Sequence, residues 1–197
     1  MNVVKMLRSA ESLESELKKE GVSEPATSAT RTHDLPAPSI DVGHAFRHLG
    51  IEITLIDVGC SYSVYLNNSS YRSGSGRETY DEVGAENGAK FVTVKTRVLN
   101  DAKKSIDLTC SRPIANYLID DRGRRFDSIG KLYRIRGNPP CNDRLQPGFT
   151  SDMTWIYRVP LDASILAFEF EDATDFDRDR TLKPAQIPLI VAPPEEI

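Results

Sequence analysis

The sequence predicts an all-β protein, an antiparallel β-sandwich of about seven to nine short strands. Three observations lead to this fold class. Apolar and polar residues alternate with period two along several segments after residue 50, which is typical of strands with one buried face. Clusters of Gly, Pro, Asn and Asp separate these segments. Beyond the N-terminus no long run has helical periodicity, and strands without intervening helices pair mainly in antiparallel fashion.

Length and composition bound the class of protein. A chain of 197 residues suits one domain of ordinary size with tails, and its 39% hydrophobic residues can fill one core. The formal net charge of −4 argues against a dedicated nucleic-acid binder, whose domain is usually basic. No stretch approaches the roughly 18 uncharged apolar residues of a membrane-spanning helix. We therefore expect no transmembrane segment and no specific nucleic-acid partner.

Residues 1–21 are predicted to form a short amphipathic helix. Val3, Leu13 and Leu17 fall on roughly one side at helical spacing, and Gly21 ends the pattern. The segment is either a helix ordered only by packing or a docking helix for a partner or a sister subunit, which would make a homo-oligomer. Lysine and arginine interrupt its apolar residues and glutamates follow, so we expect no secretory signal in this sequence.

Residues 22–40 are predicted to be a flexible linker, followed by the β-sandwich over residues 41–192 and a tail over residues 193–197. The linker is rich in Ser, Thr, Ala and Pro and holds almost no large apolar side chain. It therefore cannot bury enough surface to offset the entropy that ordering costs.

Four segments show the alternation that predicts strands. Residues 91–100 and 153–159 alternate most clearly, and residues 51–56 do so until the adjacent Leu55 and Ile56 blur the pattern. In the fourth segment the predicted buried face holds Leu166, Phe168 and Phe170. Two shorter runs, residues 117–120 and 124–127, flank an Asp-Arg-Gly turn and are predicted to form a hairpin, in which Gly123 supplies a positive φ.

A series of short motifs in this order resembles a known family. The motifs are Gly88–Val94, Val98–Asn100, Lys103–Ile106, Leu118–Phe126, Leu145–Gly148 and Tyr157–Pro160. Over residues 40–172 the chain resembles the immunoglobulin-like domain of unknown function found in bacterial lipoproteins and secreted proteins, and it is similar in fold to a small immunogenic antigen secreted by mycobacteria. The resemblance implies an immunoglobulin-like sandwich outside the membrane, without catalytic residues. Since the sequence shows no signal or lipid anchor, a cytoplasmic or virion-associated location stays open.

Three cysteines occur, without a CxxC motif that would suggest a zinc or thioredoxin-like site. Cys110 is predicted to end a strand, and Cys141 lies in the Pro-rich loop before the strand that holds Trp155. In a chain that resembles an exported family, we predict a disulfide between Cys110 and Cys141. The alternative is free thiols in a reducing cytosol. Cys60 is then buried or paired between chains.

Uneven charge suggests one partner-binding surface. Residues 112–136 carry seven Lys and Arg against three Asp, whereas residues 171–197 carry seven acidic residues against three basic ones. These stretches either oppose each other within the fold or leave a basic patch for an anionic protein or envelope component. The candidate partner-binding residues are Arg122, Arg124 and Arg125, because alternation should point at least one of them outward.

Tyrosines interleaved with Asn and Ser suggest a second surface. Tyr62, Tyr65 and Tyr71 lie in a segment whose composition is typical of an adaptable recognition loop. The same composition suits an ordinary long connection between strands.

No pattern predicts catalytic residues, a metal site or a cofactor. His44 and His48 are four apart, which suits a metal site only on a helix, and the predicted context is loop or strand. The acidic spacing over residues 175–179 matches the first half of a calcium loop, but Arg180 stands where that loop requires glycine. We therefore hypothesise a non-enzymatic immunoglobulin-like binding or interaction module of the bacterial cell envelope. The alternative is a structural subunit of a larger assembly, for example a virion, that docks through its N-terminal helix.

Overall fold

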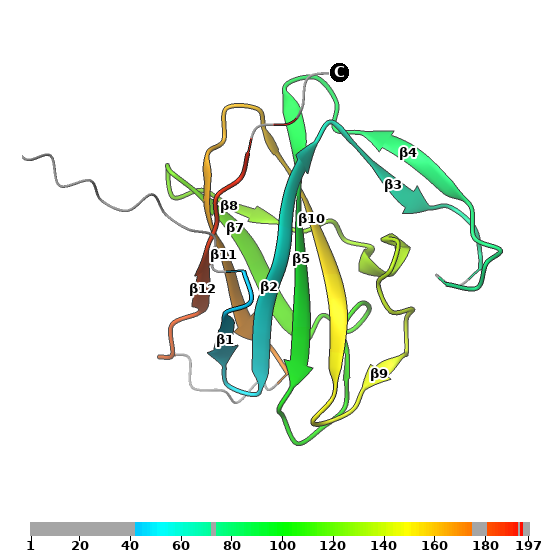
Figure 1. The fold of residues 1–197 in the computed structure, drawn as a ribbon, viewed down its shortest axis with the longest axis vertical. Coiled ribbons are helices and arrows are strands. Elements are labelled where there is room, and N and C mark those ends of the chain that lie inside the picture. The colour runs from blue at the N-terminus through cyan, green and yellow to red at the C-terminus, as the bar shows by residue number, and fades with distance from the viewer. Residues whose placement is uncertain (1–41, 72–73, 175–180, 193, 195–197) are drawn as a thin grey trace, which may run out of the picture. The chain divides into compact units, whose positions relative to one another are not determined.

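Twelve β-strands and one 3₁₀ turn make up the part of the chain that the computed structural model describes, residues 42–71, 74–174, 181–192 and 194 (Figure 1). The predicted helix over residues 1–21 and the linker over residues 22–40 lie outside the described residues, and so does the acidic segment 175–179.

Two four-stranded antiparallel sheets form the body of the fold. The first sheet has the order β1-β2-β5-β10, with β1 (Ala45–His48), β2 (Ile51–Ser61), β5 (Ala89–Asn100) and β10 (Thr150–Pro160). The second has the order β12-β11-β7-β8, with β12 (Ala185–Pro188), β11 (Ile165–Asp172), β7 (Ile114–Asp120) and β8 (Arg125–Asp127).

Two small ribbons complete the strands. One pairs β3 (Ser63–Asn67) with β4 (Tyr80–Gly84), and the other pairs β6 (Ile106–Asp107) with β9 (Arg144–Leu145). The 3₁₀ turn η2 (Leu132–Arg134) lies between β8 and β9. The expected number of strands was too low, because strands of two to five residues such as β4, β6 and β9 are too short to show alternation.

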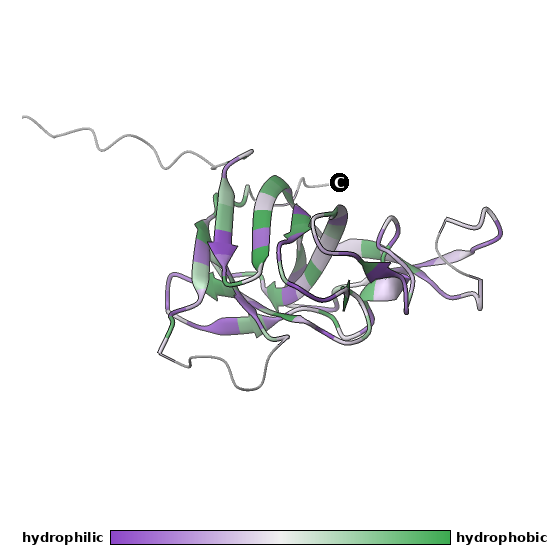
Figure 2. Cartoon of the chain, turned by 90° about the horizontal axis from the view of Figure 1, so that it is seen from below, coloured by the Kyte–Doolittle hydropathy of each residue, from purple (hydrophilic) through white to green (hydrophobic). Residues whose placement is uncertain are grey.

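The two sheets share one apolar core, which makes the fold a β-sandwich. Trp155 and Tyr157 of β10 lie across the interior from Phe168 of β11, with ring centroids 6.2 and 6.5 Å apart. All three side chains are almost completely buried. Figure 2 shows the strands banded in apolar and polar residues, as expected when one face of each sheet packs inward.

The predicted alternation is confirmed in β5, where Val92, Val94 and Val98 are buried while Lys95 and Arg97 are exposed. The blurred pattern at the end of the segment 51–56 has a structural cause. The register of β2 against β5 shifts between Leu55 and Asp57, so that the intervening residue forms a β-bulge and its side chain is exposed.

A second irregularity corrects one prediction. Leu166 was expected on the buried face with Phe168 and Phe170, but its side chain is 54% exposed. The register between β11 and β7 shifts between Ile165 and Ala167, and this turns Leu166 outward while Ile165 points into the core.

The predicted hairpin around the Asp-Arg-Gly turn is confirmed. β7 and β8 pair in antiparallel register, with Tyr117 opposite Asp127 and Ile119 opposite Arg125. Gly123 adopts φ +71°, the left-handed conformation that was expected of it.

Hydrogen bonds also join the edges of the two sheets. At one edge, the main-chain N–H of Asp172 on β11 donates to Nδ1 of His48 on β1 at 2.9 Å. At the other, the main-chain N–H of Ile129 donates to the carbonyl oxygen of Ile156 on β10 at 2.8 Å. His48 is buried on a strand and therefore has a structural contact here.

Candidate functional site

A disulfide joins Cys110 and Cys141, which are 31 residues apart, and this confirms the predicted pair. Cys110 lies in the turn after β6 rather than at the end of a strand, and Cys141 lies in the loop between η2 and β9. Cys60 on β2 is a free, partly buried thiol. Burial raises the pKa of the Cys60 thiol, and the nearby Lys90 ammonium offsets part of that effect.

The carboxylate of Asp107, the last residue of β6, organises the chain on both sides of the disulfide. Its Oδ1 accepts hydrogen bonds from the main-chain N–H groups of Thr109 and Cys110, each at 3.0 Å. Its Oδ2 accepts the N–H of Asn142 at 2.9 Å. Burial favours the protonated acid, but these hydrogen bonds outweigh it and hold the pKa of Asp107 below its ordinary value. Asp107 is therefore an ionised structural residue.

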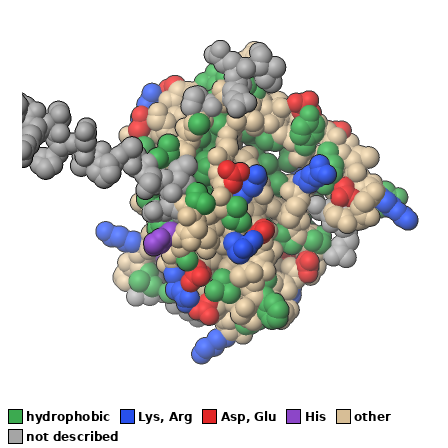
Figure 3. Space-filling model, in the orientation of Figure 1, with side chains coloured by type: hydrophobic (Ala, Val, Ile, Leu, Met, Phe, Trp, Pro, Cys, Tyr) green, Lys and Arg blue, Asp and Glu red, His purple; other side chains and the backbone are tan. Residues whose placement is uncertain are grey.

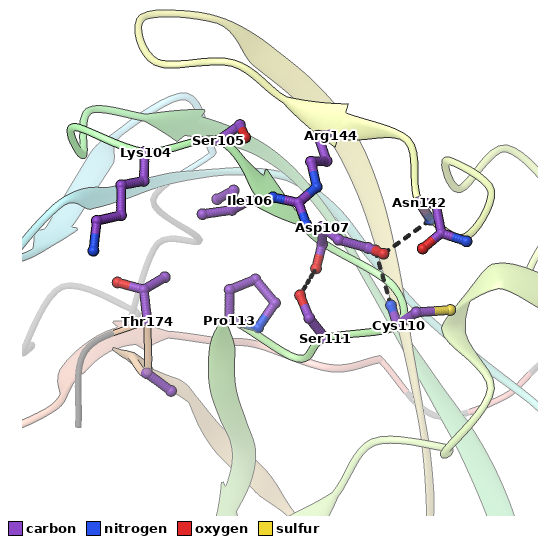
Figure 4. Close-up of a pocket in the computed structure, with 11 residues that line it drawn as sticks. Lys104, Ser105, Ile106, Asp107, Cys110, Ser111, Pro113, Asn142, Arg144 and Thr174 are labelled. Atoms are coloured by element: carbon purple, nitrogen blue, oxygen red, sulfur yellow. Dashed lines mark hydrogen bonds between the residues drawn. The ribbon is translucent and has the colours of Figure 1, made fainter.

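A pocket of about 500 Å³ opens beside this carboxylate. We call it the cationic pocket, and its polar lining consists of Lys104, Ser105, Asp107, Ser111, Asn142, Arg144 and Thr174. Figure 4 shows Lys104 and Arg144 on one side of the pocket, with Thr174 and Pro113 on the opposite side. Cys110 is part of the wall, so the disulfide fixes one border of the pocket.

In the lining that the structure describes, the two cations of the cationic pocket outnumber the single carboxylate. Neither Lys104 nor Arg144 makes a side-chain hydrogen bond or ion pair with any residue that the structure describes. The only carboxylate in the described lining belongs to Asp107, and main-chain N–H groups already occupy its oxygens. The pocket can therefore receive an anionic group, and a guanidinium such as that of Arg144 can bind a carboxylate or phosphate through two parallel hydrogen bonds.

The three predicted partner-binding arginines lie around the β7–β8 hairpin, and each has an acidic partner. Arg122 pairs with Asp162 at 2.9 Å between two exposed side chains. Arg124 pairs with the buried Asp120 at 2.7 Å, and its guanidinium also lies 5.5 Å from the ring centre of Phe126.

Arg125 has two partners. Its guanidinium forms an ion pair with Glu169 of β11 and lies 4.4 Å from the centre of the Tyr117 ring. The acids that pair with the hairpin are thus Asp120, Asp162 and Glu169, and none of them belongs to the acidic stretch 171–197. The charge count over residues 112–136 did not include two of these acids. Asp162 and Glu169 come from other parts of the chain and neutralise arginines of the hairpin.

Asp120 also caps the hairpin turn. Its Oδ1 accepts the main-chain N–H groups of Arg122 and Arg124, at 3.1 and 2.8 Å. Burial works to raise the pKa of Asp120, but the hydrogen bonds from Arg124 and Arg122 outweigh it and lower that pKa.

Paired charges also cover the outer face of the first sheet. Lys95 pairs with Asp57 at 2.9 Å and Arg97 with Asp152 at 2.8 Å, in each case between neighbouring strands. Figure 3 shows this arrangement, with Lys and Arg side chains lying beside Asp and Glu side chains across the face. Such exposed pairs contribute little to stability and leave no excess charge for a partner.

The three predicted tyrosines are exposed and lie on or near β3 and the turn that follows it. Tyr62 directly precedes β3. Tyr65 lies on β3, opposite Glu82 of β4. Tyr71 lines a different hollow, together with Tyr133 and Arg134. Among the described residues, no ring contact joins these three tyrosines.

Sequence reasoning did not single out Lys104, Asp107, Asn142 or Arg144 as site residues. One local signal was present at Asp107, because Asp followed two residues later by Thr is typical of a side chain that caps the main chain ahead of it. No local signal places Arg144 and Lys104 in one pocket, since it is the pairing of β6 with β9 that brings their segments together.

Two other features of the described ranges bear on function. No cluster of three or more His, Cys, Asp and Glu side chains in them has the arrangement to hold a metal ion. Nor do they include a helix with the length and apolar character that a bilayer crossing requires.

Comparison with known proteins gives similar folds and no family. No family model matches the chain, and no curated protein matches it. An uncharacterized β-sandwich protein from Clostridium difficile is 17% identical, with a TM-score of 0.44 over 71% of this chain and 88% of the other. A conserved hypothetical protein from Bacillus anthracis is 13% identical, with a TM-score of 0.47 over 75% and 94%. The YjhA protein from Bacillus subtilis is 12% identical, with a TM-score of 0.44 over 78% and 100%.

Proposed function

We propose that this protein is a non-enzymatic binding module of the immunoglobulin-like sandwich class, and that it binds an anionic group of a protein or polymer in the cationic pocket. One observation carries the proposal. Lys104 and Arg144 line the same hollow without an acidic partner among the described residues, whereas Arg122, Arg124 and Arg125 each have one.

The physical argument rests on shape and charge together. A pocket of about 500 Å³ is within the range that small ligands or a protruding group of a partner occupy. Its border is fixed by the disulfide and by the hydrogen bonds to Asp107. Binding of a ligand therefore costs little entropy for ordering the pocket residues. In a concave site, two cations attract an anion more strongly than they would on an open surface.

The bacterial cell envelope is the compartment that we propose. Disulfides form and persist in oxidising compartments, and the Cys110–Cys141 bond supports such a place for this chain. The resemblance of its motifs to immunoglobulin-like domains of lipoproteins and secreted proteins points the same way.

The test measures binding of two anionic probes, inorganic phosphate and poly-L-glutamate, by calorimetry with the full chain. We expect the variant with Lys104→Gln and Arg144→Gln to bind at least tenfold more weakly than the wild type. The matched control carries Arg97→Gln and Arg122→Gln, which remove the same net charge from exposed, paired positions, and its affinity should change less than about twofold.

Two results would overturn the proposal. The wild-type protein could bind neither probe, or the control variant could lose as much affinity as the pocket variant. In the second case attraction would follow net charge rather than the pocket. Thermal unfolding of both variants checks that a loss of affinity does not come from a loss of stability. We expect both to remain folded, because neither pair of substitutions breaks a buried interaction.

A further inference from the structure

A second hollow, of about 450 Å³, includes the other cysteine of the disulfide in its wall. We call it the tyrosine pocket. Its lining consists of Asn67, Ser69, Ser70, Tyr71, Tyr133, Arg134, Pro140 and Cys141. It shares no described lining residue with the cationic pocket, and nothing in the function proposed above uses it.

Internal hydrogen bonds build one wall of the tyrosine pocket. The Asn67 side chain donates to the carbonyl oxygen of Tyr71 at 3.0 Å and accepts the N–H of Ser69 at 2.9 Å. The hydroxyl of Ser69 also donates to Asn67 at 2.8 Å. The turn after β3 is therefore held in shape by its own contacts.

The opposite wall is tied to the first one directly. Leu66 of β3 forms an isolated antiparallel bridge with Ile135, the residue that follows η2. This bridge brings Tyr71 from one segment and Tyr133 and Arg134 from the other to a common hollow. The site is therefore a preformed product of two segments more than 60 residues apart.

Four side chains in this lining remain without a partner among the described residues. The hydroxyls of Ser70, Tyr71 and Tyr133 make no hydrogen bond there, and the guanidinium of Arg134, a partly buried residue, makes no ion pair. The pocket thus offers two aromatic rings, three hydroxyls and one cation to a ligand.

We infer that the tyrosine pocket binds a sugar ring that carries a carboxylate, the chemistry of a uronic acid. The apolar C–H face of a sugar packs on a tyrosine ring, while its hydroxyls exchange hydrogen bonds with Ser70 and the two tyrosines. The guanidinium of Arg134 binds the carboxylate. A simple anion would leave the tyrosine rings of the pocket unused, and a neutral sugar would leave Arg134 unused. An acidic sugar uses both.

The test titrates the isotope-labelled full chain with D-glucuronate, glucose, acetate and benzoate and follows amide shifts by NMR. We expect glucuronate to bind at least fivefold more tightly than each of the other three. Arg134→Gln should lower the affinity for glucuronate to that for glucose, and Tyr71→Ala should weaken both sugars.

Matched controls exist for both substitutions. Arg136→Gln removes a cation from the same segment, but Arg136 lies over the ring of Tyr80 and does not line the pocket. Tyr65→Ala removes an exposed tyrosine of β3 that is also outside the lining. Both control variants should bind glucuronate at the tyrosine pocket as the wild type does, as read from the shifts of the residues that line this pocket.

Several results would overturn the inference. These are no binding of glucuronate at the tyrosine pocket, equal binding of acetate or benzoate there, or an equal loss in the control variants. The variant with Lys104→Gln and Arg144→Gln separates this inference from the proposed function. It should keep its glucuronate affinity, and a loss there would assign the ligand to the cationic pocket and overturn only the present inference.

Discussion

Asp107 accepts a hydrogen bond from the main-chain N–H of Asn142 at 2.9 Å, although the two residues are 35 apart in the sequence. Its other carboxylate oxygen accepts the N–H of Cys110. Because Asn142 follows Cys141, one carboxylate connects the same two loops that the disulfide connects. The border of the cationic pocket is therefore held by a covalent bond and by an ionised side chain.

The first prediction concerns the disulfide. Replacing both Cys110 and Cys141 by Ser should lower the free energy of unfolding by about 3–4 kcal/mol, because closing a loop of this length restricts the unfolded chain. The folded state should persist, since Asp107 still joins the two loops. Urea denaturation measures the loss, and Cys60→Ser, which removes a free thiol, is the control. A double variant as stable as the wild type would contradict the prediction.

The second prediction concerns pH. The pKa of Asp107 is lower in the folded than in the unfolded chain, so its carboxylate stabilises the fold at pH values above its ordinary pKa. This stabilisation is lost as pH falls through the lowered value. Asp107→Asn should therefore be less stable than the wild type near neutrality, and the difference should shrink below about pH 4.

Urea denaturation over this pH range checks the second prediction. Asp143→Asn is a suitable control, because Asp143 lies in the same loop with an exposed side chain. A difference between Asp107→Asn and the wild type that stays constant down to low pH would show that ionisation of Asp107 has no part in stability.

The third prediction separates two arginines of the β7–β8 hairpin. The side chain of Glu169 is only 8% exposed, whereas that of its partner Arg125 is 51% exposed. Arg125→Gln should cost about 1–3 kcal/mol, because it leaves a buried carboxylate without its cation. Arg122→Gln should cost less than about 1 kcal/mol, because both members of its pair are exposed.

A double-mutant cycle completes this comparison. Adding Glu169→Gln to Arg125→Gln should recover part of the lost stability, since the unpaired buried charge disappears. Thermal unfolding provides the measurement. Equal destabilisation by Arg122→Gln and Arg125→Gln would show that burial of Glu169 does not decide the effect.

The fourth prediction concerns a hydrogen bond that crosses the core. The hydroxyl of Tyr157 on β10 donates to the side-chain oxygen of Asn116 on β7, so it joins the two sheets. Burial raises the pKa of Tyr157 well above its ordinary value, and the hydroxyl therefore stays protonated as a donor. Tyr157→Phe should cost about 1–3 kcal/mol, because the buried oxygen of Asn116 loses its donor.

Tyr117→Phe is the matched control for this fourth substitution. It removes a tyrosine hydroxyl from β7 but keeps the ring over which Arg125 lies. Its free energy of unfolding should stay within about 0.5 kcal/mol of the wild-type value. A loss in Tyr117→Phe as large as that in Tyr157→Phe would mean that the hydrogen bond across the core is not the cause.

The local pattern of the sequence determined much of the fold. Alternation was enough to predict the strands around residues 91–100 and 153–159, because a strand with one buried face imposes its period on consecutive residues. The Asp-Arg-Gly turn predicted the hairpin, since Gly123 can adopt the positive φ there. The bulges that expose Ile56 and Leu166 escaped prediction, because a bulge is a mismatch with a neighbouring strand and leaves no period of its own.

The candidate sites were decided only by the tertiary structure. The sequence placed three basic residues around Gly123, but it could not show that Asp162 and Glu169 would reach them. Nor could it show that β6–β9 pairing would bring Lys104 and Arg144 to one pocket, where Asp107 is the one carboxylate in the described lining. Local patterns depend on neighbours along the chain, whereas an ion pair or a pocket depends on which distant residues folding brings within a few ångströms of one another.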